Sequence, residues 1–208
     1  MEERNLAGAD FSNRNIGNKD FSGANLSGAN FRDSYLTEAD FTNSKLMGTN
    51  LSRTELVRAN LAGANLAGAN LSNANLAGAN LAGANLAGAN LSNARLLGAN
   101  LTEANLTEAD LSDVDLAGAN LTNTNLFKVN ISEAYLAGAN LTNANLSEAN
   151  ISDSNLAGAN LQDARFLHAN LARAYLMGAS LVNTDFLGAK IAGANFAGAD
   201  LNNALNLE

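Results

Sequence analysis

Every fifth residue from Leu6 to Leu201 is Leu, Ile or Phe, forty times in succession and without an insertion or deletion. A helix turns about 100° per residue, so residues five apart lie roughly 140° apart around it and form no apolar face. A strand alternates its side chains with period two, so residues five apart fall on opposite faces of a sheet. The period of five therefore excludes both an amphipathic helix and a flat sheet.

The rest of the five-residue unit is nearly as regular as its central residue. The residue two before the centre is Ala in 28 of 40 units, and the residue just before the centre is Asn in 24 and Asp in 7. One large and one small apolar side chain per unit suit the interior of a narrow coil. The recurring Asn is typical of turns, and copies stacked one coil apart are expected to form ladders.

This Ala-(Asp/Asn)-Leu-x-x pattern resembles the pentapeptide-repeat family, and the resemblance covers essentially the whole chain. It implies an all-β fold, a right-handed quadrilateral parallel β-helix with one pentapeptide per side and twenty residues per coil. The central Leu and the Ala two residues before it would point inward. Forty units then make about ten coils without insertion loops, a rod of roughly 48 Å at a strand spacing of about 4.8 Å.

The regular pattern sets the expected extent of the domain. We expect a single β-helix domain over residues 1–208, with regular repeats over about residues 4–203 and irregular ends at residues 1–5 and 204–208. After Leu201 no segment is long enough for a capping helix. A solenoid end exposes strand edges and core, so this end is predicted to be open to a partner.

The first coil departs from the pattern. Arg4, Arg14 and Lys19 stand where most units have Ala. Buried cations are costly without partners, so the first coil is predicted to be incomplete or splayed at an exposed end.

Composition excludes several classes of function. The chain has no Cys and a single His, His168, which leaves no thiolate metal site and few routes to catalysis, and we expect neither an enzyme nor a cofactor. The net charge of -8 disfavours binding to nucleic acid phosphates. No signal peptide or membrane-spanning run is visible, so no membrane contact is expected and a cytoplasmic location is the default expectation.

Folding the chain at twenty residues per coil sorts the surface into four sides. One side carries a Ser column just after the centre, and the opposed side carries a mixed Thr and Ala column. The same register places Phe11 over Phe31 and Phe21 over Phe41, and these rings are predicted to stack in the core.

The other two sides carry large side chains that are predicted to project outward. One side has Tyr35, Tyr135 and Tyr175 just before the centre. The opposed side has an apolar stripe after the centre, whose members are Met47, Phe127, Leu167, Leu187 and Leu207. Exposed apolar stripes mark contacts with partners, although long side chains can also lie flat on the coil and contact nothing. These residues are the candidate contacts for a protein partner or for a second copy of the chain.

Charged residues stack as well. Neighbours of opposite sign, such as Arg95 beside Asp115 and Lys128 beside Glu148, are expected to form exposed pairs that contribute about 0–1 kcal/mol each. One set is not neutralised, a candidate acidic patch made up of Asp110, Asp113, Glu133 and Asp153. It is either a solvated corner or a site for a weakly bound cation or a basic partner.

Three functions compete. The favoured hypothesis is a non-enzymatic rod that binds or scaffolds a protein partner, of unassigned cellular role. The family resemblance adds an alternative, a DNA mimic that binds DNA gyrase and protects it from quinolones. B-DNA carries one charge per about 1.7 Å, so a mimic of 48 Å would show roughly 28 negative charges, whereas this chain has a net charge of -8. Ice binding through a Ser or Thr face is the third, and the mixed ladders fit it poorly.

Overall fold

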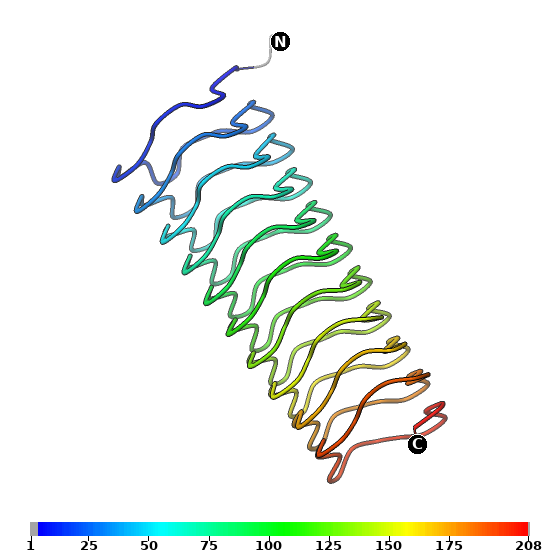
Figure 1. Ribbon diagram of the computed structural model, residues 1–208. Helices are drawn as coiled ribbons and strands as arrows, with labels where there is room; N and C mark the ends of the chain where they lie inside the picture. Colours follow the sequence, from blue (N-terminus) through cyan, green and yellow to red (C-terminus); the bar gives the residue numbers. More distant parts are fainter. Residues whose placement is uncertain (1–3, 208) are drawn as a thin grey trace.

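The computed structural model describes residues 4–207, which wind into a right-handed, four-sided parallel β-helix (Figure 1). Each unit contributes one bridge residue, the one just before its centre, and every bridge joins residue i to residue i+20, from Asn5–Asn25 to Asp185–Leu205. One turn of the solenoid is therefore twenty residues, as predicted. At this pitch the described residues make roughly ten coils stacked about 4.8 Å apart.

The bridges are single residues, so residues 4–207 contain no helix and no longer strand whose bounds could be given. Hydrogen bonds nevertheless run between coils along all four sides. Leu66 N–H donates to the Asn85 carbonyl at 2.7 Å, and Asn85 N–H donates to the Ala64 carbonyl at 2.9 Å. Within the described part of the chain, nothing helical is long and apolar enough to cross a membrane.

A tight turn follows every centre. Ala64 N–H donates to the Leu61 carbonyl at 3.0 Å, which closes a four-residue turn. The third residue of this turn, Gly63, has a φ of 65°, the sign that a type II turn requires. The same position in other units is Asn, Asp, Glu, Arg, Lys or His with φ near 57°. The turns bend the chain at each corner and direct these side chains outward.

The core is filled by the two apolar positions of each unit. Leu66 and Ala64 are both 0% exposed, and one continuous cluster of such residues runs along the interior. At the N-terminal end the predicted aromatic stacks are confirmed, with ring centroids 4.8 Å apart for Phe11–Phe31 and 5.0 Å apart for Phe21–Phe41. The two stacks meet edge to face, which fills the width of the coil.

Hydroxyl groups at the small inward position are buried without loss of hydrogen bonds. The Thr54 hydroxyl donates to the Leu51 carbonyl at 2.7 Å, and the Ser154 hydroxyl donates to the Ile131 carbonyl at 2.6 Å. No buried side-chain N or O atom lacks a partner within residues 4–207. Ser and Thr can therefore replace Ala because the backbone of the coil supplies an acceptor.

The first coil is complete, which corrects the prediction of an incomplete or splayed coil. All four of its sides bridge to the second coil, beginning with Asn5–Asn25 and ending with Asp20–Asp40. The three basic side chains are exposed rather than buried because no coil lies above them. Arg4 donates to the Asp20 carbonyl at 2.8 Å and so satisfies an acceptor at the rim of the coil.

The C-terminal end is open at its backbone. In earlier coils each central N–H donates to the coil that follows, but among residues 4–207 those of Ile191, Phe196 and Leu201 donate to no carbonyl. Leu207 does not continue the exposed stripe, contrary to the prediction. The regular bridge pattern ends at Leu205, and Leu207 is half-buried and packs against the core.

Candidate functional site

The three tyrosines project from one side of the rod, as predicted. Each occupies a bridge position, whose side chain points away from the core, and their exposed fractions are 58% for Tyr35, 59% for Tyr135 and 52% for Tyr175. Asn155 forms backbone bridges with Tyr135 on the coil before it and with Tyr175 on the coil after it, so the Asn155 side-chain amide lies between the two rings. This arrangement leaves apolar surface on both sides of a small polar floor.

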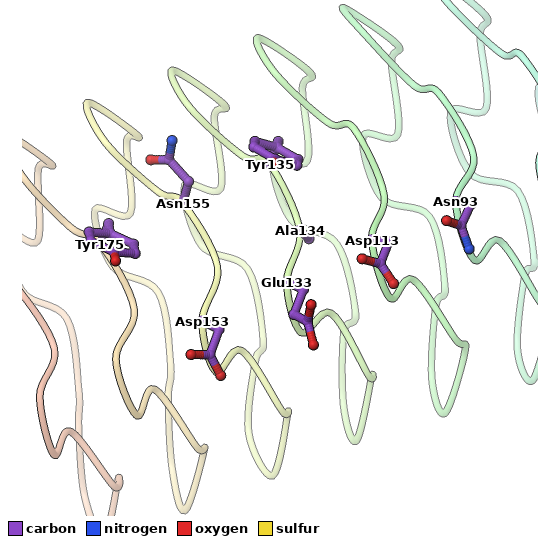
Figure 2. Close-up of a pocket in the computed structure, with 8 residues that line it drawn as sticks. All are labelled: Asn93, Asp113, Glu133, Ala134, Tyr135, Asp153, Asn155 and Tyr175. Carbon is purple, nitrogen blue, oxygen red and sulfur yellow. The ribbon is translucent and has the colours of Figure 1, made fainter.

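Three of the four predicted acidic residues occupy the turn corners beside this column. Asp113, Glu133 and Asp153 have φ values of 57°, 58° and 60°, and they follow one another at intervals of one coil, about 4.8 Å. Figure 2 shows their carboxylates in a row along the corner, with the row of Tyr135, Asn155 and Tyr175 running beside it.

The two rows enclose one shallow hollow of about 710 Å³, which we call the tyrosine groove. Its lining consists of Asn93, Asp113, Glu133, Ala134, Tyr135, Asp153, Asn155 and Tyr175. The tyrosines and the acidic residues were separate features in the sequence. They meet because the corner residue lies only two residues before the bridge residue, as in Glu133-Ala134-Tyr135.

One carboxylate of the tyrosine groove is already neutralised. Arg173 donates from Nε and from a terminal nitrogen to the two carboxylate oxygens of Asp153, both at 2.6 Å. These hydrogen bonds, together with the attraction of the guanidinium, lower the pKa of Asp153 and raise that of Arg173. The side chains of Asp113 and Glu133 have no ion-pair or hydrogen-bond partner among the described residues.

Asp110 lies outside the groove, which corrects the predicted membership of the acidic patch. Its carboxylate accepts hydrogen bonds from Ser112 N–H and from the Asn130 amide, both at 3.1 Å. Asp110 thus replaces an Asn in the ladder of its side. Within residues 4–207 no group of three His, Cys, Asp or Glu side chains is placed to hold a metal ion, so the corner does not form a cation site of that kind.

A smaller version of the groove lies near the N-terminal end. A hollow of about 370 Å³ is lined by Asn13, Asp33, Ser34, Tyr35, Arg53 and Glu55. The Arg53 guanidinium reaches the Asp33 carboxylate at 2.7 Å from the following coil, beside Tyr35. The relation of Arg53 to Asp33 is the same as that of Arg173 to Asp153, since each arginine lies one coil after its acid.

The opposed apolar stripe is less exposed than predicted. Met47 and Leu187 are about half exposed, whereas Phe127 and Leu167 are half-buried. The Lys128 ammonium lies 5.0 Å from the Phe127 ring centroid and 3.7 Å from Glu148, so it covers part of the ring. A shallow hollow of about 300 Å³ separates Phe127 from Leu167.

The remaining charges are only partly paired. The predicted neighbour Lys128–Glu148 is within 4 Å, but Arg95 and Asp115 share a bridge without an ion pair in the described structure. His168 lines the hollow beside Glu148, and its ring lies over Gly188, where an added Cβ would approach its Nδ1 within 2.3 Å. His168 is therefore a surface residue that fills the space left by a glycine.

The comparisons with known proteins agree with this architecture. The family of pentapeptide repeats matches in eight copies, over residues 5–43, 20–53, 54–93, 84–123, 94–132, 104–143, 130–166 and 169–205. No curated protein matches the chain.

Solved structures give further similarities. HetL, a pentapeptide repeat protein involved in heterocyst differentiation regulation in the cyanobacterium Nostoc sp. strain PCC 7120, is 31% identical over 97% of this chain and 89% of its own, with a TM-score of 0.44. Rfr23 from the cyanobacterium Cyanothece 51142 is 31% identical over 46% of this chain and 63% of its own, with a TM-score of 0.40. Trypsin-treated QnrB1, a plasmid-mediated fluoroquinolone resistance protein, is 18% identical over 98% of this chain and 92% of its own, with a TM-score of 0.48.

Proposed function

Because the chain belongs to the pentapeptide-repeat family, we propose that it is a non-enzymatic, rod-shaped module that binds a protein partner or a second copy of itself. The observation that carries the proposal is the placement of its large exposed apolar side chains. Among the described residues these lie on the tyrosine side, on the opposed stripe and around the C-terminal end, and none lies on the Ser side of the rod. Large exposed apolar side chains that cluster on particular faces in this way mark interaction surfaces.

The filled interior supports binding rather than catalysis. The central residues of the middle coils are completely buried, and the hollows described above are shallow and open to solvent. Enzymes usually act in pockets that enclose most of a ligand. A rod with a solid core offers surface instead, and its specificity must lie in the side chains that depart from the repeat.

Self-association and partner binding use different surfaces, so one set of variants separates them. If the C-terminal end pairs with a second copy of the chain, light scattering across a concentration series should show a rise in molecular mass. Leu201→Asp should abolish that rise. If the protein is a strict monomer, cross-linking in cells of the source organism should capture a partner. That capture should be lost in Tyr135→Ala or Leu187→Asp and kept in Asn143→Ala, a control on the Thr side.

A strict monomer whose cross-linked products are unchanged by every one of these surface variants would refute the proposal. All the substituted side chains lie outside the buried core, Leu201 at the exposed end of the rod included, so their substitution should leave the fold intact.

The two alternative functions gain no support from the surface. Residues 59–94 carry no charge, so the middle of the rod cannot imitate the phosphates of DNA. On the Thr side the hydroxyls of Thr102, Thr122 and Thr142 each donate to the ladder Asn of their own unit at 2.7 Å. Those hydroxyls are engaged within the protein, and Ala62 and Ala82 interrupt the column, which disfavours ice binding.

A further inference from the structure

The rod pairs corner carboxylates beside its tyrosines with its own arginines at two places. Arg53 holds Asp33 beside Tyr35, at 2.7 Å. Arg173, two residues before Tyr175, holds Asp153 of the preceding coil through two hydrogen bonds of 2.6 Å. In both cases a guanidinium reaches the acid from the coil that follows it, and Asp33 is also paired with its neighbour Arg32 at 3.1 Å, so the molecule itself shows which group fits this corner.

The third tyrosine has the acids but not the arginine. One coil after Asp113 the corner residue is Glu133, and one coil after Glu133 it is Asp153, whose carboxylate is already held by Arg173. Asp113 and Glu133 are exposed and unpaired within the described residues, and they line the corner edge of the tyrosine groove, on the same side of the exposed ring of Tyr135.

We propose that the tyrosine groove binds an arginine-bearing segment of a partner protein, with one guanidinium on Glu133 and against the ring of Tyr135 and a second on Asp113. The inference rests on the proposed function, and it assigns the surface and the chemistry of the partner. Arginine suits the site better than lysine because its planar fork matches a carboxylate and it stacks on aromatic rings. The groove takes this side chain and not a metal ion, since the described acids form no metal-binding group.

The spacing of the acids indicates how the partner presents its arginines. Adjacent coils place the two carboxylates about 4.8 Å apart. Side chains four residues apart on a helix are about 5–6 Å apart, whereas alternate residues of a strand are separated by about 6.6 Å. A helix with two arginines four residues apart therefore matches the pair Asp113 and Glu133 more closely.

The test uses the whole chain and a short fluorescent helical peptide with one such arginine pair, at about 0.05 M salt so that screening is weak. Fluorescence anisotropy is expected to show saturable binding. Glu133→Gln and Tyr135→Ala should each weaken it by about three- to fivefold, the size of exposed cation–π and ion-pair effects. The matched control Glu103→Gln makes the same charge change on the Thr side and should leave the affinity unchanged.

A second peptide with lysines in place of the arginines should bind at least about threefold more weakly. Equal binding of the two peptides, or equal weakening by Glu103→Gln, would show only general attraction to an acidic rod and would overturn the inference. Absence of saturation at millimolar peptide would overturn it as well. The proposed function would survive either result if the cross-linking experiment still captured a partner that depends on Leu187 or Leu201.

Discussion

At the scale of the residue, the position two after each centre has two roles. It is the third residue of each turn, and its side chain forms the charged surface at the corners. Its φ is positive in every turn, a conformation that L-residues adopt at a cost of about 1 kcal/mol or more and that Gly adopts freely. The chain nevertheless places Asp113, Glu133, Lys128 and Arg173 there. These side chains form the acidic corner and its ion pairs, so the surface chemistry is carried by the position that the repeat strains most.

The centre of a unit should tolerate far less change than the surface. Leu116 is fully buried, and we expect Leu116→Ala to destabilise the protein by about 2–5 kcal/mol, because it removes buried methyl groups and leaves a cavity. Leu187→Ala, on the half-exposed stripe, should cost less than about 1 kcal/mol. Denaturant unfolding of the two variants measures the difference in their free energies of unfolding. Equal losses of stability would contradict the assignment of Leu116 to an inward position and of Leu187 to an outward one.

The ion pair at the groove should be visible in the titration of its acid. The pKa of Asp153 is lowered by the hydrogen bonds and charge of Arg173. A lowered pKa in the folded state means that the pair stabilises the protein above the ordinary Asp pKa of about 3.9, and that this contribution is lost as the pH falls through the lower folded value.

We therefore expect Arg173→Gln to raise the pKa of Asp153 toward its ordinary value in an NMR titration. Asp10 serves as an internal control, because its lowered pKa comes first from the Ser12 backbone N–H and hydroxyl. A shift of Asp10 as large as that of Asp153, or no shift of Asp153, would refute the pairing.

At the scale of the element, the four sides of the rod differ in how their polar groups are used. On the Ser and Thr sides the hydroxyls donate to the neighbouring Asn, as Ser92 does to Asn90 at 2.7 Å. The Asn side chain in turn caps a backbone N–H and stacks on its copy one coil away. The tyrosine side breaks this ladder, since Tyr135 and Tyr175 stand where an Asn would bond, and within residues 4–207 the Asn155 oxygen between them only caps Ala157 N–H.

The Asn ladder gives a prediction on the Thr side. The Asn80 amide donates to Asn60, its oxygen accepts from Asn100 at 3.1 Å, and the same oxygen caps Ala82 N–H at 3.2 Å. Asn80→Ala should lower the free energy of unfolding by about 1–3 kcal/mol because it removes all three hydrogen bonds.

Asn80→Asp should cost less, because a carboxylate keeps both acceptor contacts, as Asp110 does elsewhere. Thermal unfolding of the two variants compares the losses. Equal losses for Asp and Ala would mean that the donor to Asn60, which both variants lack, and not the cap, holds the ladder together.

At the scale of the whole molecule, each coil contacts only the coils before and after it, and the rod has two unlike ends. Solenoids of this kind are stabilised approximately by the sum of their units and interfaces. Among residues 4–207, both end coils have backbone N–H groups without a carbonyl acceptor and incompletely covered central residues, for example Asp10 N–H and Phe11 at one end and Phe196 at the other. The ends differ in chemistry, because the first coil presents basic side chains and an arginine-capped rim.

The repeat predicts which deletions the rod accepts. Removing residues 69–88, one whole coil, leaves the period intact, and we expect a folded protein whose denaturant m-value falls by about a tenth with the surface lost. Removing residues 69–86 breaks the period and misaligns every centre across the junction. Circular dichroism and denaturant unfolding should show cooperative unfolding for the first deletion only, and equal behaviour would contradict the twenty-residue coil.

The sequence by itself determined the solenoid, the inward positions and the columns of each side. The period of five excluded a helix and a flat sheet, and the resemblance to the pentapeptide-repeat family supplied the four-sided coil of twenty residues, from whose register the aromatic stacks Phe11–Phe31 and Phe21–Phe41 follow. The ends were predicted less well, since the loss of a neighbouring coil changes what Arg4 and Leu207 contact, and a repeat pattern carries no information on where it stops.

Only the tertiary structure decided what the surface side chains do with one another. The register places the tyrosines and the acids in separate columns, but a turn brings residues two apart, such as Glu133 and Tyr135, to the two edges of one groove. It also separated Asp110 from that groove and covered Phe127 with Lys128. These outcomes depend on the direction and reach of side chains around a corner, which the period of five does not specify.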